Sequence, residues 1–551
     1  MRFRRWHTLS VFSACFAALL ILHERLLRLP YYWDEAGYYV PAARDILLRG
    51  SLIPLSTVSN AHPPLVMLWL AAAWKVLGYT PWVTRSAMIV IAAFSLAGIY
   101  QLGERAANPV VALYTTVLTA LYPVFFAQSS LGHVDLAAAG LTFWALAAYL
   151  DNRPRAVAFW FCLAVMAKET ALLTPAVLGL WEVVGWVAQR WPRSEVPALP
   201  WRQRIGGQLW LGRGDHASAS RKTAWMVAAL SSPVVPLSLW YAYHFAKTGY
   251  AFGNPEFVRY NVTATLSVTR IVLAMILRLW QAFGYMHLWV LTGAMLATMW
   301  LAPLRDRGVE RPRIRIAVQM VLLIVVVGYV VAMSAVGGAV LARYLLAAVP
   351  LVILAAVSTI WRRSRWHPVI LLAVAISFVA AWLSNPPYGF APEDNLAYRD
   401  FIVLHQDAAR FLEAHNHGGR VLTAWPASDE LARPSLGYVH NSMQVLRIEN
   451  FSETEVSNAV RLRDTYDMAL VFSTKYQAAH SLSLEWPAWG RTNARYFDFH
   501  RDVTPSVAAE ILGGRIVFSE ERKGLWIAVI AIDKVELAGI PGGHGRITRQ
   551  E

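Results

Sequence analysis

The sequence predicts an α-helical polytopic membrane protein followed by a soluble α/β domain. Apolar residues make up 56% of the 551 residues and charged residues 15%, whereas soluble chains average roughly 45–50% apolar and about 25% charged. Apolar runs long enough to be helical spans recur up to residue 384, and the residues after them are richer in charge. This composition excludes an ordinary cytosolic enzyme.

The chain carries more positive than negative charge, with 50 Lys and Arg against 35 Asp and Glu. In a membrane protein such an excess marks cytoplasmic loops and lipid headgroup contacts rather than nucleic acid. Cys15 and Cys162 both lie inside apolar runs. The sequence therefore shows no disulfide framework and no zinc-type Cys/His spacing.

We expect about 11 transmembrane helices. The first follows the short basic stretch Met1–His7 and precedes no cleavage site, so it is predicted to stay uncleaved with its N-terminus in the cytoplasm. The run at 156–167 is short enough for a tilted or re-entrant segment. The predicted spans lie near residues 9–26, 82–103, 108–127, 136–150, 156–167, 171–188, 224–246, 286–303, 316–333, 339–360 and 369–384.

One further apolar run, at 63–79, can either span the membrane or lie on its surface. If it does not span, four basic loops all fall on the side of the N-terminus, as the positive-inside rule requires; they lie at 151–155, 189–223, 304–315 and 361–367. Residues 63–79 are therefore predicted to be a surface helix. The same count makes 268–283 a second surface helix, with Arg270 and Arg278 on it.

The opposite face then receives a first outer loop at 27–81 and the whole segment 385–551. We accordingly divide the chain into a membrane domain, 1–384, and an extracytoplasmic soluble α/β domain, 385–551. Helical patterns such as Phe401–His415 alternate there with strand-like runs. These runs are Arg420–Ala424, Met468–Phe472, Arg515–Phe518 and Leu525–Ile532.

The first outer loop carries adjacent acids, Asp34 and Glu35, directly after Trp33. Adjacent carboxylates at a membrane surface are costly unless they are used. A structural role is the alternative, because Asp34 can cap a helix over Glu35–Arg49. Both roles can hold together, since a cap also fixes a carboxylate rigidly.

Four more polar groups are expected at the same outer face, and each has a plainer structural alternative. Asp135 can be a helix cap, Lys168 and Glu169 can form an internal ion pair, and Arg343 can reach the headgroups instead of holding a phosphate. Such acids, histidines and cations suit a reaction between a phosphate-bearing lipid and a hydroxyl acceptor. The groups are His62 before Pro63-Pro64, His133 with Asp135, Lys168-Glu169 and Arg343-Tyr344.

Two motifs in the first outer loop carry a family resemblance. Trp33-Asp34-Glu35-Ala36 followed by His62-Pro63-Pro64-Leu65 is similar to the protein O-mannosyltransferases and their bacterial relatives. These are integral-membrane glycosyltransferases of the GT-C fold, comprising family 39 and the aminoarabinose-transferase-like group. The resemblance covers roughly residues 1–360. It implies a polyprenyl-phosphate sugar donor and action outside the cytoplasm.

The resemblance also implies roles for individual residues. Asp34 would be the general base that takes the proton of the acceptor hydroxyl, and Glu35 would position the acceptor or support the loop. The donor phosphate would lie near His62, Lys168, Arg343 and Tyr344. The acceptor or second acidic site would include His133, Asp135 and Glu169, of which Asp135 matches the family only loosely.

The chain departs from the aminoarabinose transferases in both motifs. They carry Asp-Glu-Thr-Arg where this chain has Asp34-Glu35-Ala36-Gly37, and Glu-Lys-Pro-Pro where it has Ala61-His62-Pro63-Pro64. Two phosphate-binding cations are therefore missing, which weakens lipid A as acceptor and aminoarabinose as donor. No loop is long enough for the β-trefoil of the eukaryotic mannosyltransferases, so the acceptor stays open among protein, lipid and glycan.

We therefore expect an inverting glycosyl transfer from a polyprenyl-phosphate lipid, with membrane lipids around the chain and no nucleic acid partner. Cations near the phosphate would make a cofactor unnecessary; alternatively Asp34, Glu35, His62 and Asp135 bind a divalent metal ion. An apolar groove for the prenyl chain is expected near 156–188 and 224–246. The short loops and Ala/Leu/Arg-rich composition suggest a bacterial inner membrane, with a periplasmic C-terminal domain.

Two other classes of protein stay open at this point. A transporter or lipid flippase would place charged residues near the bilayer midplane and often shows inverted repeats. A non-catalytic scaffold would bind a partner through its outer domain.

Overall fold

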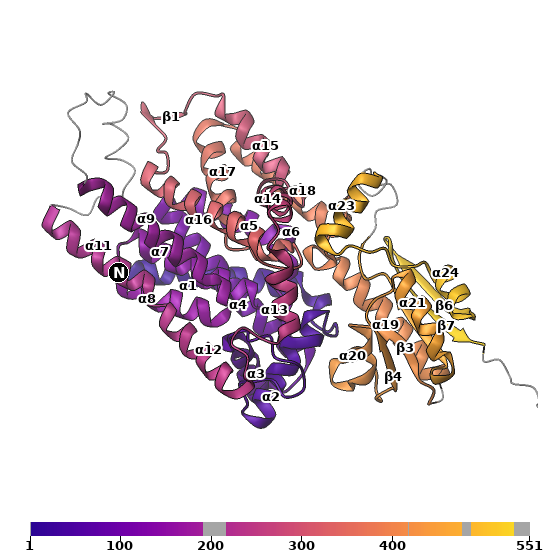
Figure 1. Cartoon of the computed structure of the whole chain (residues 1–551). Helices are drawn as coiled ribbons and strands as arrows, with labels where there is room; N and C mark the ends of the chain where they lie inside the picture. Colours follow the sequence, from indigo (N-terminus) through magenta and orange to yellow (C-terminus); the bar gives the residue numbers. More distant parts are fainter. Residues whose placement is uncertain (1, 191–215, 417, 477–485, 534–551) are drawn as a thin grey trace, which may run out of the picture. The chain divides into compact units, whose positions relative to one another are not determined.

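The computed structural model describes residues 2–190, 216–416, 418–476 and 486–533, in two compact units (Figure 1). Unit 1 comprises Met1–Ile402 and Lys475–Phe499, and unit 2 comprises Val403–Thr474 and His500–Glu551. The last apolar helix ends at Leu383, next to the boundary that the sequence suggested. Compact unit 1 nevertheless continues to residue 402 and takes up 475–499.

Unit 1 is mostly helical, and every apolar run expected to span the membrane is helical. These helices are α1 (Arg2–Leu22), α4 (Pro81–Ala106), α5 (Pro109–Leu121) with α6 (Pro123–Gln128), α7 (Asp135–Leu150), α8 (Pro154–Ala167), η3 (Glu169–Leu172) with α9 (Leu173–Arg190), α11 (His216–Ser231) with α12 (Val234–Thr248), α15 (Leu288–Met299), α16 (Ile316–Ala335), η5 (Ala342–Leu345) with α17 (Val349–Arg363), and α18 (His367–Leu383).

Length and hydropathy single out a subset of these helices. Within the described residues four are long and apolar enough to cross a bilayer, namely Pro81–Ala106, Glu169–Ala188, Arg221–Thr248 and Ile316–Ala335. The count becomes five if a pair bent by 90°, Pro255–Thr265 and Val268–Phe283, is one span. The other apolar helices are shorter, so the number of about 11 spans stays a prediction.

Several helices begin with the same local signal, a capping side chain followed by proline. The Thr80 hydroxyl accepts a hydrogen bond from the Val83 amide at 3.2 Å, and Asn108 Oδ1 accepts one from the Val111 amide at 3.0 Å. Pro81 and Pro109 then occupy first helical positions, where a missing N–H costs nothing. The sequence thus fixes where α4 and α5 start.

Helices α4 and α7 pack closely through small residues. A Cβ built on Gly140 would lie 1.9 Å from Ser95 Oγ and 3.1 Å from Ser95 Cα. Where lipid surrounds a helix pair, such close approach supplies much of the association energy. The start of α7 is therefore held firmly against α4.

Gly140→Ala is expected to destabilise the protein by about 1–3 kcal/mol, because the added methyl group overpacks this contact. Gly293→Ala in α15 is the matched control, since nothing lies within 4 Å of a Cβ there. Thermal unfolding in detergent, followed by tryptophan fluorescence, measures both. Equal melting temperatures for the two variants would contradict the close packing.

One hydrogen bond on each predicted side of the membrane connects two segments that were assigned to that side. Arg311 donates to the Trp361 carbonyl at 2.8 Å, which links two predicted inner loops, 304–315 and 361–367. Gly132 donates to Glu35 at 2.5 Å, which links the first outer loop to the segment of His133 and Asp135, also expected at the outer face. Of the basic loop at 189–223, residues 191–215 lie outside the described part of the chain.

The first outer loop contains η2 (Glu35–Tyr39, one π-helical turn), α2 (Val40–Arg49) and α3 (Leu65–Leu77). The helix expected after Asp34 is therefore present, and it ends at Gly50 in a left-handed conformation, φ 65°. Helix α3 packs along α4, where Trp74 donates to Thr84 at 2.9 Å. Helix α3 has 13 residues, as many as α5, which is predicted to span the membrane. Length therefore does not distinguish a surface helix from a span, and the place of α3 on the membrane surface stays a prediction from loop charge.

The predicted surface helix at 268–283 is α14 (Val268–Phe283), which follows α13 (Pro255–Asn261) and η4 (Thr263–Thr265). Its arginines do not face the membrane surface. Arg270 donates to the Gly337 and Gly338 carbonyls at 2.8 and 2.9 Å, and Arg278 donates to the Leu341 carbonyl at 2.6 Å. Both are buried while Val268 is 80% exposed, so the apolar face points outward.

Unit 2 is a mixed five-stranded sheet in the order β4-β3-β5-β7-β6. The parallel part is β4 (Val445–Ile448), β3 (Val421–Ala424) and β5 (Met468–Phe472), and β7 (Leu525–Ile532) and β6 (Gly514–Arg522) add antiparallel strands. This confirms the four predicted strands and adds β4. The helices of this region are α19 (Ala397–His415), which begins in unit 1, α20 (Ala427–Ala432), α21 (Glu453–Ala459) and α24 (Pro505–Leu512).

Candidate active site

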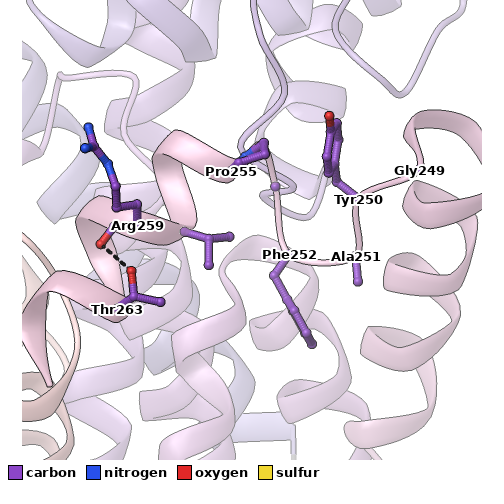
Figure 2. A pocket seen from close by; sticks show the side chains of 9 residues that line it. Gly249, Tyr250, Ala251, Phe252, Pro255, Arg259 and Thr263 are labelled. Atoms are coloured by element: carbon purple, nitrogen blue, oxygen red, sulfur yellow. Dashed lines mark hydrogen bonds between the residues drawn. The ribbon is translucent and has the colours of Figure 1, made fainter.

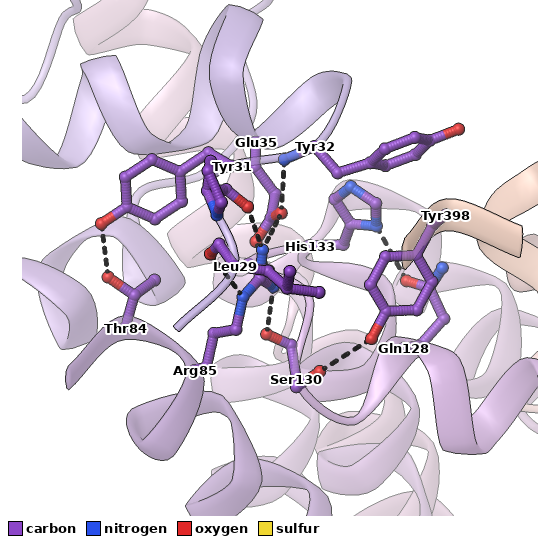
Figure 3. Close-up of polar contacts among 12 residues, drawn as sticks. Leu29, Tyr31, Tyr32, Glu35, Thr84, Arg85, Gln128, Ser130, His133 and Tyr398 are labelled. Atoms are coloured by element: carbon purple, nitrogen blue, oxygen red, sulfur yellow. Dashed lines mark hydrogen bonds and ion pairs between the residues drawn. The ribbon is translucent and has the colours of Figure 1, made fainter. Parts of the chain in front are cut away.

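The candidate site rests on a fully buried ion pair between Glu35 and Arg85 (Figure 3). Arg85 Nη1 and Nη2 lie 3.3 and 3.2 Å from the two carboxylate oxygens. Glu35 also accepts the amides of Tyr32 and Gly132, and Arg85 donates to the Ser130 carbonyl at 3.0 Å. The pair joins the first outer loop, α4 and the loop before α7.

These contacts distinguish between the two roles proposed for Glu35 from the sequence, positioning of the acceptor and support of the loop. Both side chains are 0% exposed, and both carboxylate oxygens are occupied by the protein. A group so enclosed cannot meet an acceptor molecule. The contacts favour support of the loop over positioning of an acceptor or direct catalysis.

Asp34 occupies a different environment from its neighbour. Its backbone is helical (φ −61°, ψ −27°) and its side chain makes no capping hydrogen bond, so the expected cap role is wrong. Trp33 before it adopts φ 44°, a strained value for a residue with a Cβ. The Asp34 carboxylate stays 31% exposed and contacts Arg343 Nη2. The turn thus presents one acid outward and buries the next.

Arg343, in η5, is the centre of the site. Its guanidinium contacts three carboxylates: Asp34, Glu393 at 2.9 Å and Asp135 at 3.5 Å. Nη1 also lies 3.0 and 3.3 Å from the two ring nitrogens of His133. Arg343 is 3% exposed. It therefore does not reach toward headgroups but joins four segments of unit 1.

Lys168 extends this network. Its Nζ donates to Asp135 Oδ1 at 2.5 Å and lies 4.3 Å from the centre of the Tyr344 ring. The guanidinium carbons of Arg278 and Arg343 lie 5.5 and 5.7 Å from the same ring. Asp135 is the first residue of α7 rather than its cap. One partly exposed tyrosine thus faces three cations.

His62 and Glu169 form the outer end of the network, with Nδ1 and Oε2 3.1 Å apart. Three aromatic rings surround the imidazole, from Tyr38, Tyr39 and Phe257 at 5.5–5.8 Å. Glu169 follows Lys168 directly. The structure therefore brings every candidate residue into one contiguous cluster, with Glu35 beneath it.

Two further acids complete the cluster, Glu393 and Asp394 in η6 (Pro392–Asp394). Burial raises the pKa of Glu393 to about 8, although the Arg343 guanidinium opposes this, and burial raises the pKa of Asp394 to about 7. Three buried carboxyl oxygens of this cluster accept no hydrogen bond within the described residues: Asp135 Oδ2, Glu393 Oε1 and Asp394 Oδ1. A ligand rich in O–H donors would satisfy them.

The raised pKa of Glu393 predicts how stability depends on pH. Folding favours the protonated carboxyl, so this contribution is complete below the ordinary pKa of 4.5 and is lost as pH rises through about 8. Glu393→Gln should therefore flatten the fall in melting temperature between about pH 5 and pH 8.5. The exposed Glu521→Gln is the control. A wild-type slope in Glu393→Gln would refute the prediction.

The described residues contain no group of three or more His, Cys, Asp or Glu side chains placed to hold a metal ion. Asp34, Glu35, His62 and Asp135, the set considered from the sequence, are instead engaged with arginine, lysine or glutamate. That the reaction needs no cofactor stays a prediction.

An open hollow is lined by residues that directly follow α12 (Figure 2). Tyr250, Phe252 and Arg259 are among its walls, and Arg259 accepts a hydrogen bond from Thr263 through its carbonyl at 3.2 Å. Phe257 on the same helix, α13, packs against His62. The hollow and the site are thus separated by one short helix.

Sequence reasoning missed four residues of this region. Arg85 could have been found from the sequence, because a charged residue in an apolar span usually has a function or a partner. Arg278 was placed on a membrane surface, and Glu393 in a separate domain. Gln128 gave no signal, since an amide at the end of an apolar run is common.

Residues 61–199 match the family model described as dolichyl-phosphate-mannose-protein mannosyltransferase. No curated protein matches the chain. ArnT from Cupriavidus metallidurans, in the apo state, is similar at a TM-score of 0.51 and 13% identity, over 96% of this chain and 98% of that one. The same protein bound to undecaprenyl phosphate gives 0.49 and 14%, over 95% and 97%.

The oligosaccharyltransferase of Archaeoglobus fulgidus, in complex with zinc and sulfate, gives a TM-score of 0.45 and 11% identity, over 94% of this chain and 72% of that one. At these identities the apo ArnT match shows the fold. The chain has the GT-C fold, as the motifs of the first outer loop predicted.

Proposed function

We propose that the chain is a membrane glycosyltransferase that moves a sugar from a polyprenyl-phosphate donor to a hydroxyl acceptor, with Asp34 as the general base. One observation carries the proposal. Of the three carboxylates that contact Arg343 in the described part of the chain, Asp34 is the one that is partly exposed, at 31%, while Asp135 and Glu393 are 4% exposed. A base must reach the acceptor, whereas the buried acids hold the arginine.

The chemistry follows from this arrangement. The acceptor oxygen bonds to the anomeric carbon as the bond from that carbon to the phosphate oxygen breaks, with inversion, and Asp34 takes the hydroxyl proton. The departing phosphate gains charge, which Arg343 and Lys168 would compensate. Since Arg343 already contacts three carboxylates, phosphate binding requires that one of these contacts yields. Tyr344 would lie beside the phosphate because it faces both cations.

The buried acids fit a sugar. Carboxylate oxygens without a hydrogen-bond donor, such as Glu393 Oε1 and Asp394 Oδ1, are expensive to bury. Sugar hydroxyl groups can supply those hydrogen bonds. The family model covering 61–199, whose description includes a dolichyl-phosphate-linked mannose, supports a polyprenyl-phosphate donor and a mannose-like sugar.

The donor lipid needs an apolar path to the site. The hollow with Tyr250, Phe252 and Arg259 follows α12 directly, next to one of the segments expected to form the groove. Its aromatic walls suit a prenyl chain and its arginine suits a phosphate. We assign donor entry to this side.

The site would face the extracytoplasmic space of a bacterial inner membrane. Asp135 begins α7 and Asp151 follows its end, about 24 Å away for 16 residues. Gly132, just before the first end, contacts Glu35 of the first outer loop, and the basic loop 151–155 follows the other end. Unit 2 would then be periplasmic. Because Asp34, Asp135 and Lys168 lie at helix ends rather than midway, this arrangement does not favour a transporter.

The test is transfer by the purified full chain in lipid nanodiscs. Radiolabelled polyprenyl-phosphate sugars are offered as donors, with protein, lipid and glycan acceptors. The expected result is labelled product of inverted configuration from at least one donor. Absence of transfer and of donor hydrolysis across the panel, with folded protein, would sink the proposal.

A further inference from the structure

Arg278, on α14, is a fully buried cation that contacts no carboxylate within the described residues. Its Nε donates to the Met333 carbonyl at 3.3 Å, and its Nη1 donates to Gln281 Oε1 at 2.7 Å and to the Leu341 carbonyl at 2.6 Å. Its Nη2 has no hydrogen-bond partner in the same part of the chain. The guanidinium therefore keeps its positive charge unpaired, and one of its nitrogens is left to donate.

The other two cations of the candidate site are already paired with acids. Arg343 contacts three carboxylates, and Lys168 donates to one of these, Asp135. A phosphate at either cation would also meet the negative charge of those acids. Of the three cations, Arg278 is the one that an incoming anion can pair with, as far as the described residues show, without replacing a carboxylate.

The Tyr344 ring places Arg278 beside those two cations. The ring centre lies 5.5 Å from the guanidinium carbon of Arg278, and Lys168 Nζ and the guanidinium carbon of Arg343 lie 4.3 and 5.7 Å from the same centre. The charge of Arg278 also acts on the acids of η6. Burial raises the pKa of Asp394, and the cations that oppose this include Arg343 and Arg278. Arg278 thus belongs to the electrostatic surroundings of the site.

Two buried atoms of this region lack partners of opposite kinds within the described residues. Arg278 Nη2 is a donor without an acceptor, and Asp394 Oδ1 is an acceptor without a donor. The other carboxyl oxygen of Asp394 accepts the Tyr285 hydroxyl at 2.6 Å. A phosphate oxygen can accept from the guanidinium, and a sugar hydroxyl can donate to the carboxyl oxygen. A sugar joined to a phosphate offers both groups in one molecule.

We propose that Arg278 binds the phosphate of the donor through Nη2. This inference rests on the proposed function and adds to Lys168 and Arg343 a cation that no acid neutralises. When the bond to the anomeric carbon breaks, the phosphate oxygen keeps the electron pair, so the phosphate passes from one negative charge to two. An unpaired guanidinium stabilises that added charge more than a guanidinium already held by acids.

The alternative is that Arg278 only ties α14 to the segment 333–341 through its carbonyl contacts. The first test therefore compares undecaprenyl phosphate with undecaprenol, the same lipid without the phosphate. Tryptophan fluorescence of the full chain in detergent measures both Kd values, and wild type should prefer the phosphate. Arg278→Gln should raise the Kd for undecaprenyl phosphate about tenfold or more, the usual cost of losing a hydrogen bond to a charged group. Its Kd for undecaprenol should not change, and Arg278→Lys, which keeps the charge, should lose less.

Arg270 provides the matched control from the same helix. It also donates to two backbone carbonyls of the loop before η5, and its Nη1 also lacks a partner within the described residues. Its guanidinium packs over Phe497 at 5.4 Å instead of over Tyr344. Arg270→Gln therefore removes the same charge and similar ties, but it should leave the preference for undecaprenyl phosphate near wild type.

The outcomes separate this inference from the proposed function. If wild type transfers sugar and prefers undecaprenyl phosphate while Arg278→Gln keeps that preference, the role of Arg278 alone is overturned. An equal loss of the preference in Arg278→Gln and Arg270→Gln, or an equal weakening of both lipids in Arg278→Gln, shows a structural effect and overturns it too. If wild type shows neither the preference nor any transfer, both proposals fail together.

Discussion

Asp34→Asn is expected to reduce sugar transfer by about 10²–10⁴-fold, the usual contribution of a positioned general base. The amide is nearly isosteric and still accepts a hydrogen bond from Arg343, but it cannot take the acceptor proton. The kcat should fall, while binding of undecaprenyl phosphate stays near wild type. Initial rates with the donor identified in the transfer assay measure the first, and fluorescence titration the second.

Asp151→Asn is the matched control for this variant. Asp151 pairs with Arg105 at 2.9 Å, as Asp34 pairs with Arg343, but it follows the far end of α7. Its replacement should leave turnover within about twofold of wild type. Near-normal turnover of Asp34→Asn would remove Asp34 as the base, and an equal loss in both variants would show that the effect is structural.

The membrane part of the fold was predictable because lipid imposes simple rules. Apolar runs became helices throughout. The division of the loops between two membrane sides stays a prediction from their charge. Strand β4 was missed because Val445–Ile448 is short and carries Arg447 in its middle. The bend between α13 and α14 was missed because hydropathy does not reveal direction.

The candidate site was predictable as a set of residues but not as a set of partners. The Trp33-Asp34-Glu35 motif located it, yet the sequence does not reveal the positive φ of Trp33 or that Asp34 is partly exposed while Glu35 is buried. Partners such as Arg343 and Glu393 stand far from the motif in sequence. Their pairing depends on how the helices pack, which a single sequence does not contain.

Arg85→Met is expected to destabilise the protein by about 3–5 kcal/mol, the cost of leaving a buried carboxylate without its cation. Arg85 makes five side-chain hydrogen bonds, to Glu35 and to the carbonyls of Leu29, Pro30 and Ser130. All of these are lost together. Because they join the loop of Asp34 to α4, transfer should fall as well. Thermal unfolding in detergent and folded yield after size-exclusion chromatography measure the effect.

A double variant tests whether the loss of stability in Arg85→Met comes from the uncompensated charge of Glu35 or from lost packing. Glu35→Gln combined with Arg85→Met removes both charges, so the double variant should be more stable than Arg85→Met alone. Arg44→Met removes an exposed arginine that lies 5.9 Å from the Tyr79 ring centre, and it should change the melting temperature little. If the double variant unfolds at a lower temperature than Arg85→Met, the charge of Glu35 is not what Arg85 compensates, and the buried pair is not the foundation of the loop.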